Sequence, residues 1–430
     1  MTTDPRRVIE AVWRLEAPRL IAGLTRLVHD LDHAEDLAHD ALVAALEKWP
    51  TGGIPDNPGA WLNTVARRRA FDALKKGKRA GLNYQRWAAD LLRDEPPPQF
   101  IDDSPVKDDL LRLIFLTCHP LLSSEAQVAL TLRLLGGLTT AEIARALLVP
   151  EATVAQRIVR AKRTLAAAQV PFELPETGEL TARTDSVLQV IYLIFSEGYA
   201  ASSGNRWTRK ELCDEALRLG RVLAALSPNE PEVLGLAALM EFQASRLGAR
   251  TTAEGDPILL SDQNRSLWDR VLISRGQDTL ERALRLGRPL GPYALQAAIA
   301  ECHARATRPQ DTDWPRIAAL YDALVQVVSS PVVMLNRAAA VGMAYGADAG
   351  WQAVEELSAH PSLSSYPYLP ALRGDLLEKL ERWTAAAAEF ERAAALTSNL
   401  RERSLMLERS EHCRKQAIDH QQRPSGQDAN

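Results

Sequence analysis

The most informative stretch of the chain is GLTTAEIARALLVPEATVAQRIVRAKRTL, residues 137–165, which has the pattern of two short helices joined by a turn. Thr139 or Thr140 can cap the first helix, and Glu142 lies in its first turn, where the helix dipole favours negative charge. The first helix ends before Pro150, because proline cannot continue a helix interior. The second helix carries apolar residues at helical spacing, which predicts one buried face made of Val154, Ile158, Ala161 and Leu165.

The remaining face of the second helix is polar and basic. It holds Thr153, Gln156, Arg157, Arg160 and Arg163. A helix pair that buries one side and presents arginines on the other is suited to entering the DNA major groove. The alternative is an ordinary helical hairpin whose basic face is solvated.

A second basic segment lies nearer the N-terminus. Residues 49–59, WPTGGIPDNPG, are rich in turn formers and predict a loop. The helix expected from Ala60 to about Lys76 is anchored by Trp61 and other apolar residues, and its other positions are crowded with Arg67, Arg68, Arg69, Lys75 and Lys76. Basic residues beside a loop that bears an aromatic side chain suit single-stranded or melting DNA. A merely soluble basic helix is the alternative.

Composition narrows the class of protein. A length of 430 residues predicts about three domains, and the net charge of −4 leaves any DNA contact to local basic patches. No apolar run is long enough for a membrane span, and the N-terminus lacks a signal-peptide core. The cysteines are far apart and form no CxxC pair, which argues against zinc and disulfides and favours a reducing cytoplasm: Cys118, Cys213, Cys302 and Cys413.

The C-terminal half repeats weakly. Four prolines each precede a helix rich in alanine and leucine: Pro231, Pro292, Pro331 and Pro367. The last three are 39 and 36 residues apart, and the first gap of 61 leaves room for an insertion near residues 248–276. A period of this length predicts an α-solenoid of the tetratricopeptide type. The clearest repeat holds Ala386, Phe390 and Ala393, which have the A-x3-F-x2-A spacing of a tetratricopeptide second helix.

One segment permits a metal hypothesis. Its imidazoles and carboxylates share one helical face by spacing: His29, His33, Asp36 and Asp40. The simpler interpretation is a charged, solvated helix face, and residues 30–32 look more like a helix start than a helix interior. A metal-dependent hydrolase that uses His29, His33 and Asp36 is therefore kept only as a third hypothesis, and no catalytic motif supports it.

Three of these segments, taken in order, resemble a bacterial sigma factor of the extracytoplasmic-function (ECF) group of the sigma-70 family. Residues 34–49, AEDLAHDALVAALEKW, resemble regions 2.1–2.2, which dock on the RNA polymerase clamp. Residues 58–76, PGAWLNTVARRRAFDALKK, resemble regions 2.3–2.4, which melt and read the −10 element. Residues 137–165 resemble region 4.2, which reads the −35 element.

The C-terminal part also has family-like segments. IYLIFSEGY from residue 191, EVLGLAALM from 232 and MLNRAAAV from 334 resemble the extension of the ECF42 subgroup, which is described as tetratricopeptide-like. The resemblance implies that this extension carries the regulation and that no transmembrane anti-sigma partner is needed. An unknown protein or ligand at the C-terminal domain is the further partner that it leaves open.

The resemblance also assigns roles to residues. The polymerase clamp would be faced by Asp36, Leu37, Asp40 and Leu42. A flipped −10 base would be held by Asp56 and Asn57, and strand opening and backbone contact would be supported by Trp61, Asn63, Arg67 and Arg68. Arg69, Lys75 and Lys76 are DNA-binding candidates of the same helix. The −35 groove would be addressed by Thr153, Gln156, Arg157 and Arg160, with Lys162 and Arg163 on phosphates.

The predicted fold is all-α. Sigma region 2 is expected over residues 1–79, an acidic linker over 80–107, sigma region 4 over 108–170, a tetratricopeptide-like regulatory domain over 180–420 and a disordered tail over 421–430. The predicted function is a cytoplasmic sigma factor that directs core RNA polymerase to promoter DNA at −10 and −35 elements, with no membrane contact, catalytic residue, metal or cofactor. The alternative is a helix-turn-helix regulator with a protein-binding solenoid that does not engage core polymerase.

Overall fold

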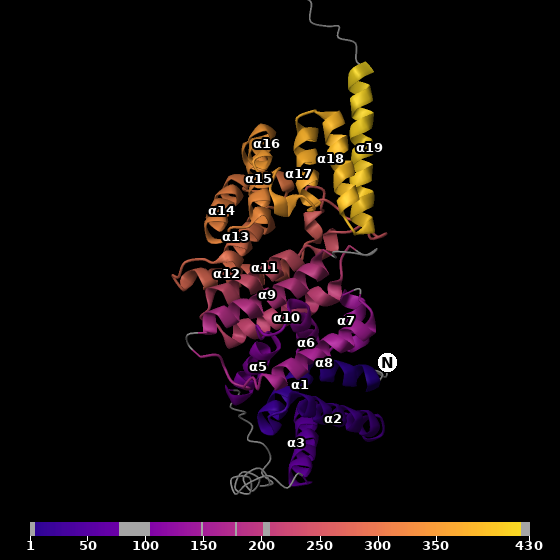
Figure 1. The fold of residues 1–430 in the computed structure, drawn as a ribbon, viewed down its shortest axis with the longest axis vertical. Coiled ribbons are helices and arrows are strands. Elements are labelled where there is room, and N and C mark those ends of the chain that lie inside the picture. Colours follow the sequence, from indigo (N-terminus) through magenta and orange to yellow (C-terminus); the bar gives the residue numbers. More distant parts are fainter. Residues whose placement is uncertain (1–4, 77–103, 148, 177–178, 201–206, 423–430) are drawn as a thin grey trace, which may run out of the picture. The chain divides into compact units, whose positions relative to one another are not determined.

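The protein is seen in a computed structural model that describes residues 5–76, 104–147, 149–176, 179–200 and 207–422 (Figure 1). Within these ranges the regular structure is helical, apart from one isolated bridge between Thr251 and Pro257, so the all-α prediction is confirmed. The chain divides into two compact units, Met1–Leu193 and Ile194–Asn430. The division falls inside one helix, α9 (Leu180–Tyr199).

The first unit begins with three helices that pack on one another: α1 (Pro5–Val28), α2 (Leu31–Gly52) and α3 (Pro58–Lys76). Asp30 caps α2, since its Oδ1 accepts a hydrogen bond from the backbone N of His33 at 2.8 Å. Asn57 caps α3 in the same way, accepting from the backbone N of Ala60 at 3.0 Å. Short polar side chains at these positions satisfy helix N–H groups that have no partner within the helix.

The second part of this unit holds the predicted helix-turn-helix. Its helices are α5 (Ser104–Thr117), α6 (Ser124–Leu134), α7 (Thr140–Leu147) and α8 (Glu151–Ala167). Thr139 and Glu142 form a reciprocal capping box, in which each accepts a hydrogen bond from the other's backbone N. The buried residues of α8 are Val154, Ile158, Ala161 and Leu165, as the spacing predicted.

The start of α9 completes the first unit. The hydroxyl of Ser186 donates to the carbonyl of Cys118 at 2.9 Å, and Gln127 Nε2 donates to the same carbonyl at 3.1 Å. Arg183 Nη2 donates to the carbonyl of Phe115 at 2.9 Å. The domain boundary was expected between residues 170 and 180. Arg183 and Ser186 lie after it in the sequence but bond to the first unit, which extends to Leu193. Most of the expected acidic linker, 80–107, lies outside the described residues, and α5 begins at its end.

The second unit is a succession of helices in which neighbours along the chain pack on one another. They are α10 (Lys210–Leu226), α11 (Pro231–Ala244), α12 (Arg270–Arg285), α13 (Pro292–Arg305), α14 (Trp314–Val327), α15 (Pro331–Tyr345), α16 (Ala347–Glu355), α17 (Tyr368–Lys379), α18 (Trp383–Leu396) and α19 (Leu400–Gln422). Prolines open α11, α13 and α15, and Pro367 directly precedes α17, as predicted. This arrangement is consistent with a helical repeat.

The expected insertion interrupts this succession between α11 and α12. Residues 245–269 form two short 3₁₀ turns and the isolated bridge, and α12 begins at Arg270, earlier than the expected end of the insertion at 276. We call residues 245–269 the insertion segment.

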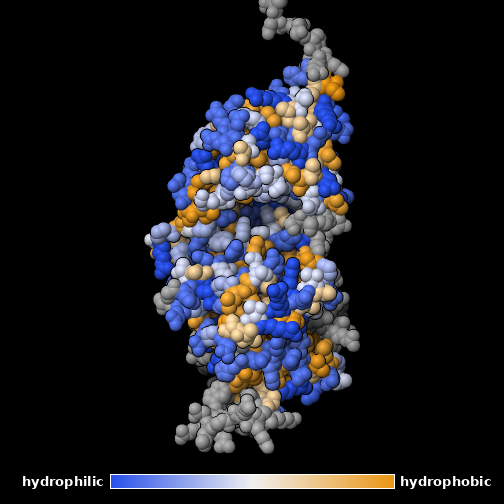
Figure 2. Space-filling model, in the orientation of Figure 1, coloured by the Kyte–Doolittle hydropathy of each residue, from blue (hydrophilic) through white to orange (hydrophobic). Residues whose placement is uncertain are grey.

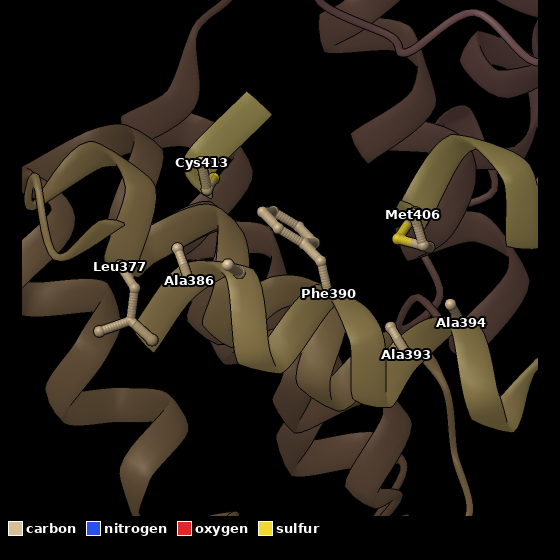
Figure 3. Packing of buried hydrophobic residues seen from close by; sticks show 8 residues of the cluster. Leu377, Ala386, Phe390, Ala393, Ala394, Met406 and Cys413 are labelled. Carbon is tan, nitrogen blue, oxygen red and sulfur yellow. The ribbon is translucent and has the colours of Figure 1, made fainter. Parts of the chain in front are cut away.

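The last repeat has the close packing that its spacing predicted. Phe390, Ala386 and Ala393 are buried on α18 between α17 and α19 (Figure 3). Gly374 of α17 lies against the ring of Phe390, where an added Cβ would come within 2.8 Å of a ring carbon. The small residue and the large ring therefore fit each other, and the helix approach depends on both.

A still closer approach joins α15 and α16. A Cβ added to Gly350 would lie 2.7 Å from the Cα of Gly342, so the clash would be with backbone rather than with a flexible side chain. We expect Gly350→Ala to lower the free energy of unfolding by about 1–3 kcal/mol, because overpacking outweighs the helix propensity gained with alanine. Gly248→Ala is the control, since its nearest new contact would be the carbonyl of Leu267 at 3.8 Å. Urea unfolding of both variants measures the difference, and equal midpoints would contradict the expectation.

Candidate nucleic-acid interface

The exposed face of α8 keeps the polar and basic character that the sequence predicted. Gln156, Arg160 and Arg163 are exposed, whereas Thr153 and Arg157 are half-buried. The buried stripe fixes the helix through its opposite side, so these side chains share one surface. Ala155 and Val159 are exposed on the same helix, which leaves apolar contact area among the polar groups.

Lys162 departs from this surface. Its Nζ lies 2.6 Å from the Glu35 carboxylate and 2.7 Å from that of Asp32, and its side chain is largely buried. Asp32 and Glu35 belong to α2, so the two ion pairs tie α8 to α2 within the first unit. In this arrangement Lys162 contacts carboxylates, and its assignment to a DNA phosphate stays a prediction.

Glu35 is the centre of this contact. It is only 6% exposed, and it also accepts a hydrogen bond from Arg133 Nε of α6 at 2.7 Å. Burial alone would raise the pKa of Glu35, but the charges and hydrogen bonds of Lys162 and Arg133 outweigh it and hold the pKa below its ordinary value. Sequence reasoning missed Glu35, because its partners lie far along the chain and no local pattern marks them.

The loop before α3 and the start of that helix carry the residues predicted for the −10 element. Asp56 and Asn57 are exposed, and Asn57 uses its Oδ1 as the helix cap. Trp61 is half-buried because its ring packs edge-on against Trp49, with the centroids 5.3 Å apart. Asn63 is exposed on the next turn.

The arginines of α3 differ in their surroundings. Arg68 is exposed, and Arg69 pairs with Asp40 of α2 at 3.0 Å. Arg67 is half-buried, and its pKa is lowered by burial and by the charge of Arg26, against the effect of Asp109. Arg68 is therefore the one of these three that is open to solvent without a described ion pair. The side chains of Lys75 and Lys76 lie outside the described residues.

The predicted polymerase-facing residues separate into two groups. Asp36 and Asp40 are exposed on α2, whereas Leu37 is 5% exposed and packs into the core, and its assignment to the polymerase clamp stays a prediction. Leu42 is half-buried. The apolar residue that stands open beside the two aspartates is Val43, which is 49% exposed. Its spacing of three from Asp40 and seven from Asp36 was the signal that could have found it.

The metal hypothesis gains no support. His29 follows the end of α1 with a positive φ of 54°, and Asp30 then starts α2, so His29 does not share a helix with His33 and Asp36. Among the described residues no group of three or more histidine, cysteine, aspartate and glutamate side chains is placed to hold a metal ion. Within the same residues, none of the helices combines the length and apolarity needed to cross a membrane.

Comparison with known proteins agrees with this geometry. Residues 12–80 match sigma-70 region 2, residues 112–165 match sigma-70 region 4, and residues 183–284 match a family of unknown function, DUF6596. An uncharacterized protein of Rhizobium meliloti (strain 1021) is 43% identical over 397 residues, which cover 92% of this chain and 93% of that protein. The chain belongs to the family of that protein. It carries sigma-70 regions 2 and 4 followed by a DUF6596 domain.

A more distant similarity bears on the role of these domains. The ECF RNA polymerase sigma factor SigK of Mycobacterium sp. (strain KMS) is 28% identical over 152 residues, which cover 34% of this chain and 76% of that protein. No solved structure matches the chain. Sigma-70 regions 2 and 4 together with this relative support a sigma-factor-like role in transcription, with core RNA polymerase and promoter DNA as partners.

The buried Glu35 makes a prediction about acid stability. We expect Glu35→Gln to lower the free energy of unfolding at pH 7 by roughly 1–3 kcal/mol, because Lys162 and Arg133 would lose a buried counter-charge. A carboxyl whose pKa is lowered by folding stabilises the protein above its unfolded pKa, about 4.3, and loses that effect as the pH falls through the folded value. The difference in free energy of unfolding between the wild type and Glu35→Gln should therefore shrink below about pH 4.

Denaturant unfolding between pH 3 and 7 measures this difference. Glu47→Gln serves as the control, because Glu47 is an exposed carboxylate on the same helix. A gap between Glu35→Gln and the wild type that stays constant across this range would show that the charge of Glu35 is not its cause.

Proposed function

We propose that the protein is a sigma factor of the ECF group that directs core RNA polymerase to a limited set of promoters in the cytoplasm, and that its C-terminal helical unit regulates this activity. The observation that carries the proposal is the pairing of two surfaces in one chain. The loop before α3 and the exposed residues of α3 form one, and the polar face of α8 forms the other. The matches to sigma-70 regions 2 and 4 fall on these same helices.

The α8 face would read the −35 element. Gln156 and Arg160 are exposed and have the side chains that recognise base edges in a major groove, while Arg163 is placed to contact phosphate. Thr153 and Arg157 flank them and are half-buried, which suits a positioning contact near the backbone. Lys162 would join the phosphate contacts only after leaving Glu35 and Asp32.

The α3 side would open and hold the −10 element. Asp56 and Asn57 are exposed on the loop, and Asn57 uses only its Oδ1 as the helix cap. Trp61 follows on α3, and its ring would offer a flat apolar surface to an unstacked base. Asn63, Arg67 and Arg68 would contact the separated strands, with Arg69, Lys75 and Lys76 adding positive charge.

The α2 surface of Asp36, Asp40, Val43 and Leu42 would dock on polymerase. Leu37 would act from inside, by holding α2 in the core. The alternative function is a helix-turn-helix regulator that does not engage polymerase. It would use α8 to bind DNA but would not explain the α2 surface. Exposed Val43 beside two aspartates favours a protein contact, because an apolar side chain with a charged rim is typical of interfaces.

Asp36→Asn discriminates between the two functions. Asp36 is exposed, while Asp40 pairs with Arg69, so Asp36 is the cleaner target. We expect this variant to bind core polymerase several-fold more weakly and to give less specific run-off transcript from the protein's own upstream region, while its binding to duplex −35 DNA is unchanged. Glu47→Gln is the matched control on the same helix. The sigma-factor proposal fails if the wild type, with or without its second unit, yields no specific transcript.

Arg160→Ala tests the α8 face. We expect its affinity for the promoter's −35 duplex to fall by about 5- to 100-fold, since a lost base contact of arginine costs about 1–3 kcal/mol. Arg285→Ala is the control, because Arg285 is an exposed helix arginine of the second unit. Fluorescence anisotropy at several salt concentrations gives both affinity and salt slope. Equal affinities for the two variants would remove α8 from the proposed interface.

Removal of the second unit tests regulation. The fragment should end after Leu193, the last residue of the first unit, since one that ended at the expected boundary before residue 180 would lack Arg183 and Ser186, which donate to the carbonyls of Phe115 and Cys118. We expect promoter output from residues 1–193 to differ at least several-fold from that of the full chain. Unchanged output in a reporter assay, with equal protein levels, would contradict a regulatory role.

A further inference from the structure

The second unit contains a cavity of about 370 Å³. Its walls come from the insertion segment and from α15, α17 and α19, four parts of the chain that are distant in sequence. Figure 2 shows a hollow on this face of the molecule, beneath α15 and α17 as they are drawn in Figure 1. A cavity of this size, built from several elements, is in the range that holds small organic ligands.

Most of one wall is aliphatic. It is formed by Ile258, Leu259 and Leu260 of the insertion segment, Leu335 of α15, and Leu405 and Met406 of α19. When an apolar group displaces water from apolar side chains that line an open cavity, the free energy of the system falls. The wall therefore suits a hydrocarbon body.

Two arginines of the insertion segment, Arg246 and Arg250, line the same cavity. Arg250 is only 8% exposed, and its guanidinium lies over the ring of Tyr199, 3.6 Å from the centroid. Its Nη2 donates a hydrogen bond to the Tyr199 carbonyl at 3.0 Å. Arg246 donates to the Tyr199 hydroxyl and to Gln243 Oε1. Neither arginine has an ion pair with any carboxylate in the described part of the chain.

The acidic residues of the cavity are already engaged. Asp375 pairs with Arg409 at 2.9 Å and with Lys379 at 3.1 Å. Glu402 accepts a hydrogen bond from the hydroxyl of Thr397. The arginines thus keep most of their five N–H donors without a charged acceptor, and burial together with the charge of Arg246 lowers the pKa of Arg250. A buried cation of this kind is costly unless an anion accompanies it.

Gln263 adds a second open polar group. It is 5% exposed, and its Nε2 donates to the carbonyl of Ile258 at 3.1 Å, but its buried Oε1 has no hydrogen-bond partner among the described residues. Buried amide oxygens normally accept a hydrogen bond, so we expect Gln263 Oε1 to accept one from a donor in or beside the cavity.

We propose that this cavity binds a small amphipathic monocarboxylate, with its carboxylate on Arg246 and Arg250 and its apolar body against the aliphatic wall. A guanidinium holds a carboxylate through two parallel hydrogen bonds. A single negative charge fits better than two, because Asp375 and Glu402 also line the cavity and would repel a second. The insertion segment and α19, which form two sides of the cavity, are joined by the Arg401–Asp256 ion pair at 2.5 Å.

This inference concerns the second unit and does not depend on the sigma-factor proposal, because its test measures binding alone. The probes are decanoate, decanol and decylamine, which share an apolar chain and differ in the head group. We expect decanoate to bind the full-length protein in isothermal titration calorimetry and to raise its melting temperature, and decanol and decylamine to bind at least 10-fold more weakly. Equal binding of the three probes, or no binding of decanoate, would overturn the proposal.

Two variants locate the site. Arg250→Gln should weaken decanoate binding by about 10- to 100-fold, since hydrogen bonds to charged groups contribute about 1.5–3 kcal/mol. Arg308→Gln is the control, an exposed arginine of the same unit. If Arg250→Gln does not fold, Ala339→Phe provides the second test of the site. Ala339 lines the cavity, so the larger side chain would fill it while both arginines remain. Decanoate binding that survives Ala339→Phe in the folded protein would rule the cavity out.

Discussion

The contact of α2 with α6 and α8 depends on a buried carboxylate. Glu35 is taken out of water on α2 and is stabilised there by cations from two other helices, Arg133 of α6 and Lys162 of α8. A lone buried charge would be expensive, so Glu35 needs at least one of these cations beside it. If α8 left α2, however, Lys162 would return to water and Glu35 would keep its pair with Arg133 of α6, so the net cost of separation would be smaller than the cost of deleting one partner. The contact is thus specific without being irreversible.

This matters for the proposed interface because Lys162 and the residues proposed to face DNA occupy different sides of α8. Arg160 and Arg163 stay exposed while Lys162 holds Glu35. The helix can therefore keep its reading surface open in the arrangement seen here. An approach of DNA phosphates toward Lys162 would set their negative charge against Glu35 and Asp32, so the carboxylates and the DNA compete for the same cation.

The sequence predicted what short-range periodicity and steric rules control. The helix cap at Thr139 or Thr140, the buried stripe of α8 and the helix starts at Pro231, Pro292 and Pro331 all follow from spacing within a few residues, and the structure places the cap at Thr139. What it missed depends on partners far along the chain. Glu35 looks like an ordinary surface acid, and Leu37 lies on a stripe whose depth only the packed neighbours decide. The Gly342–Gly350 approach likewise requires two helices to be placed first.

The cavity of the second unit was also not predicted, because it forms where the chain departs from the repeating pattern. Successive helices α13 to α19 bury their faces in local apolar clusters, each shared by neighbouring helices. The insertion segment breaks that order and brings Arg246 and Arg250 against α15, α17 and α19. Aliphatic side chains from the repeats and cations from the insertion then face each other. Neither part alone would make an amphipathic site, which is why the departure from the repeat, rather than the repeat itself, carries the binding chemistry.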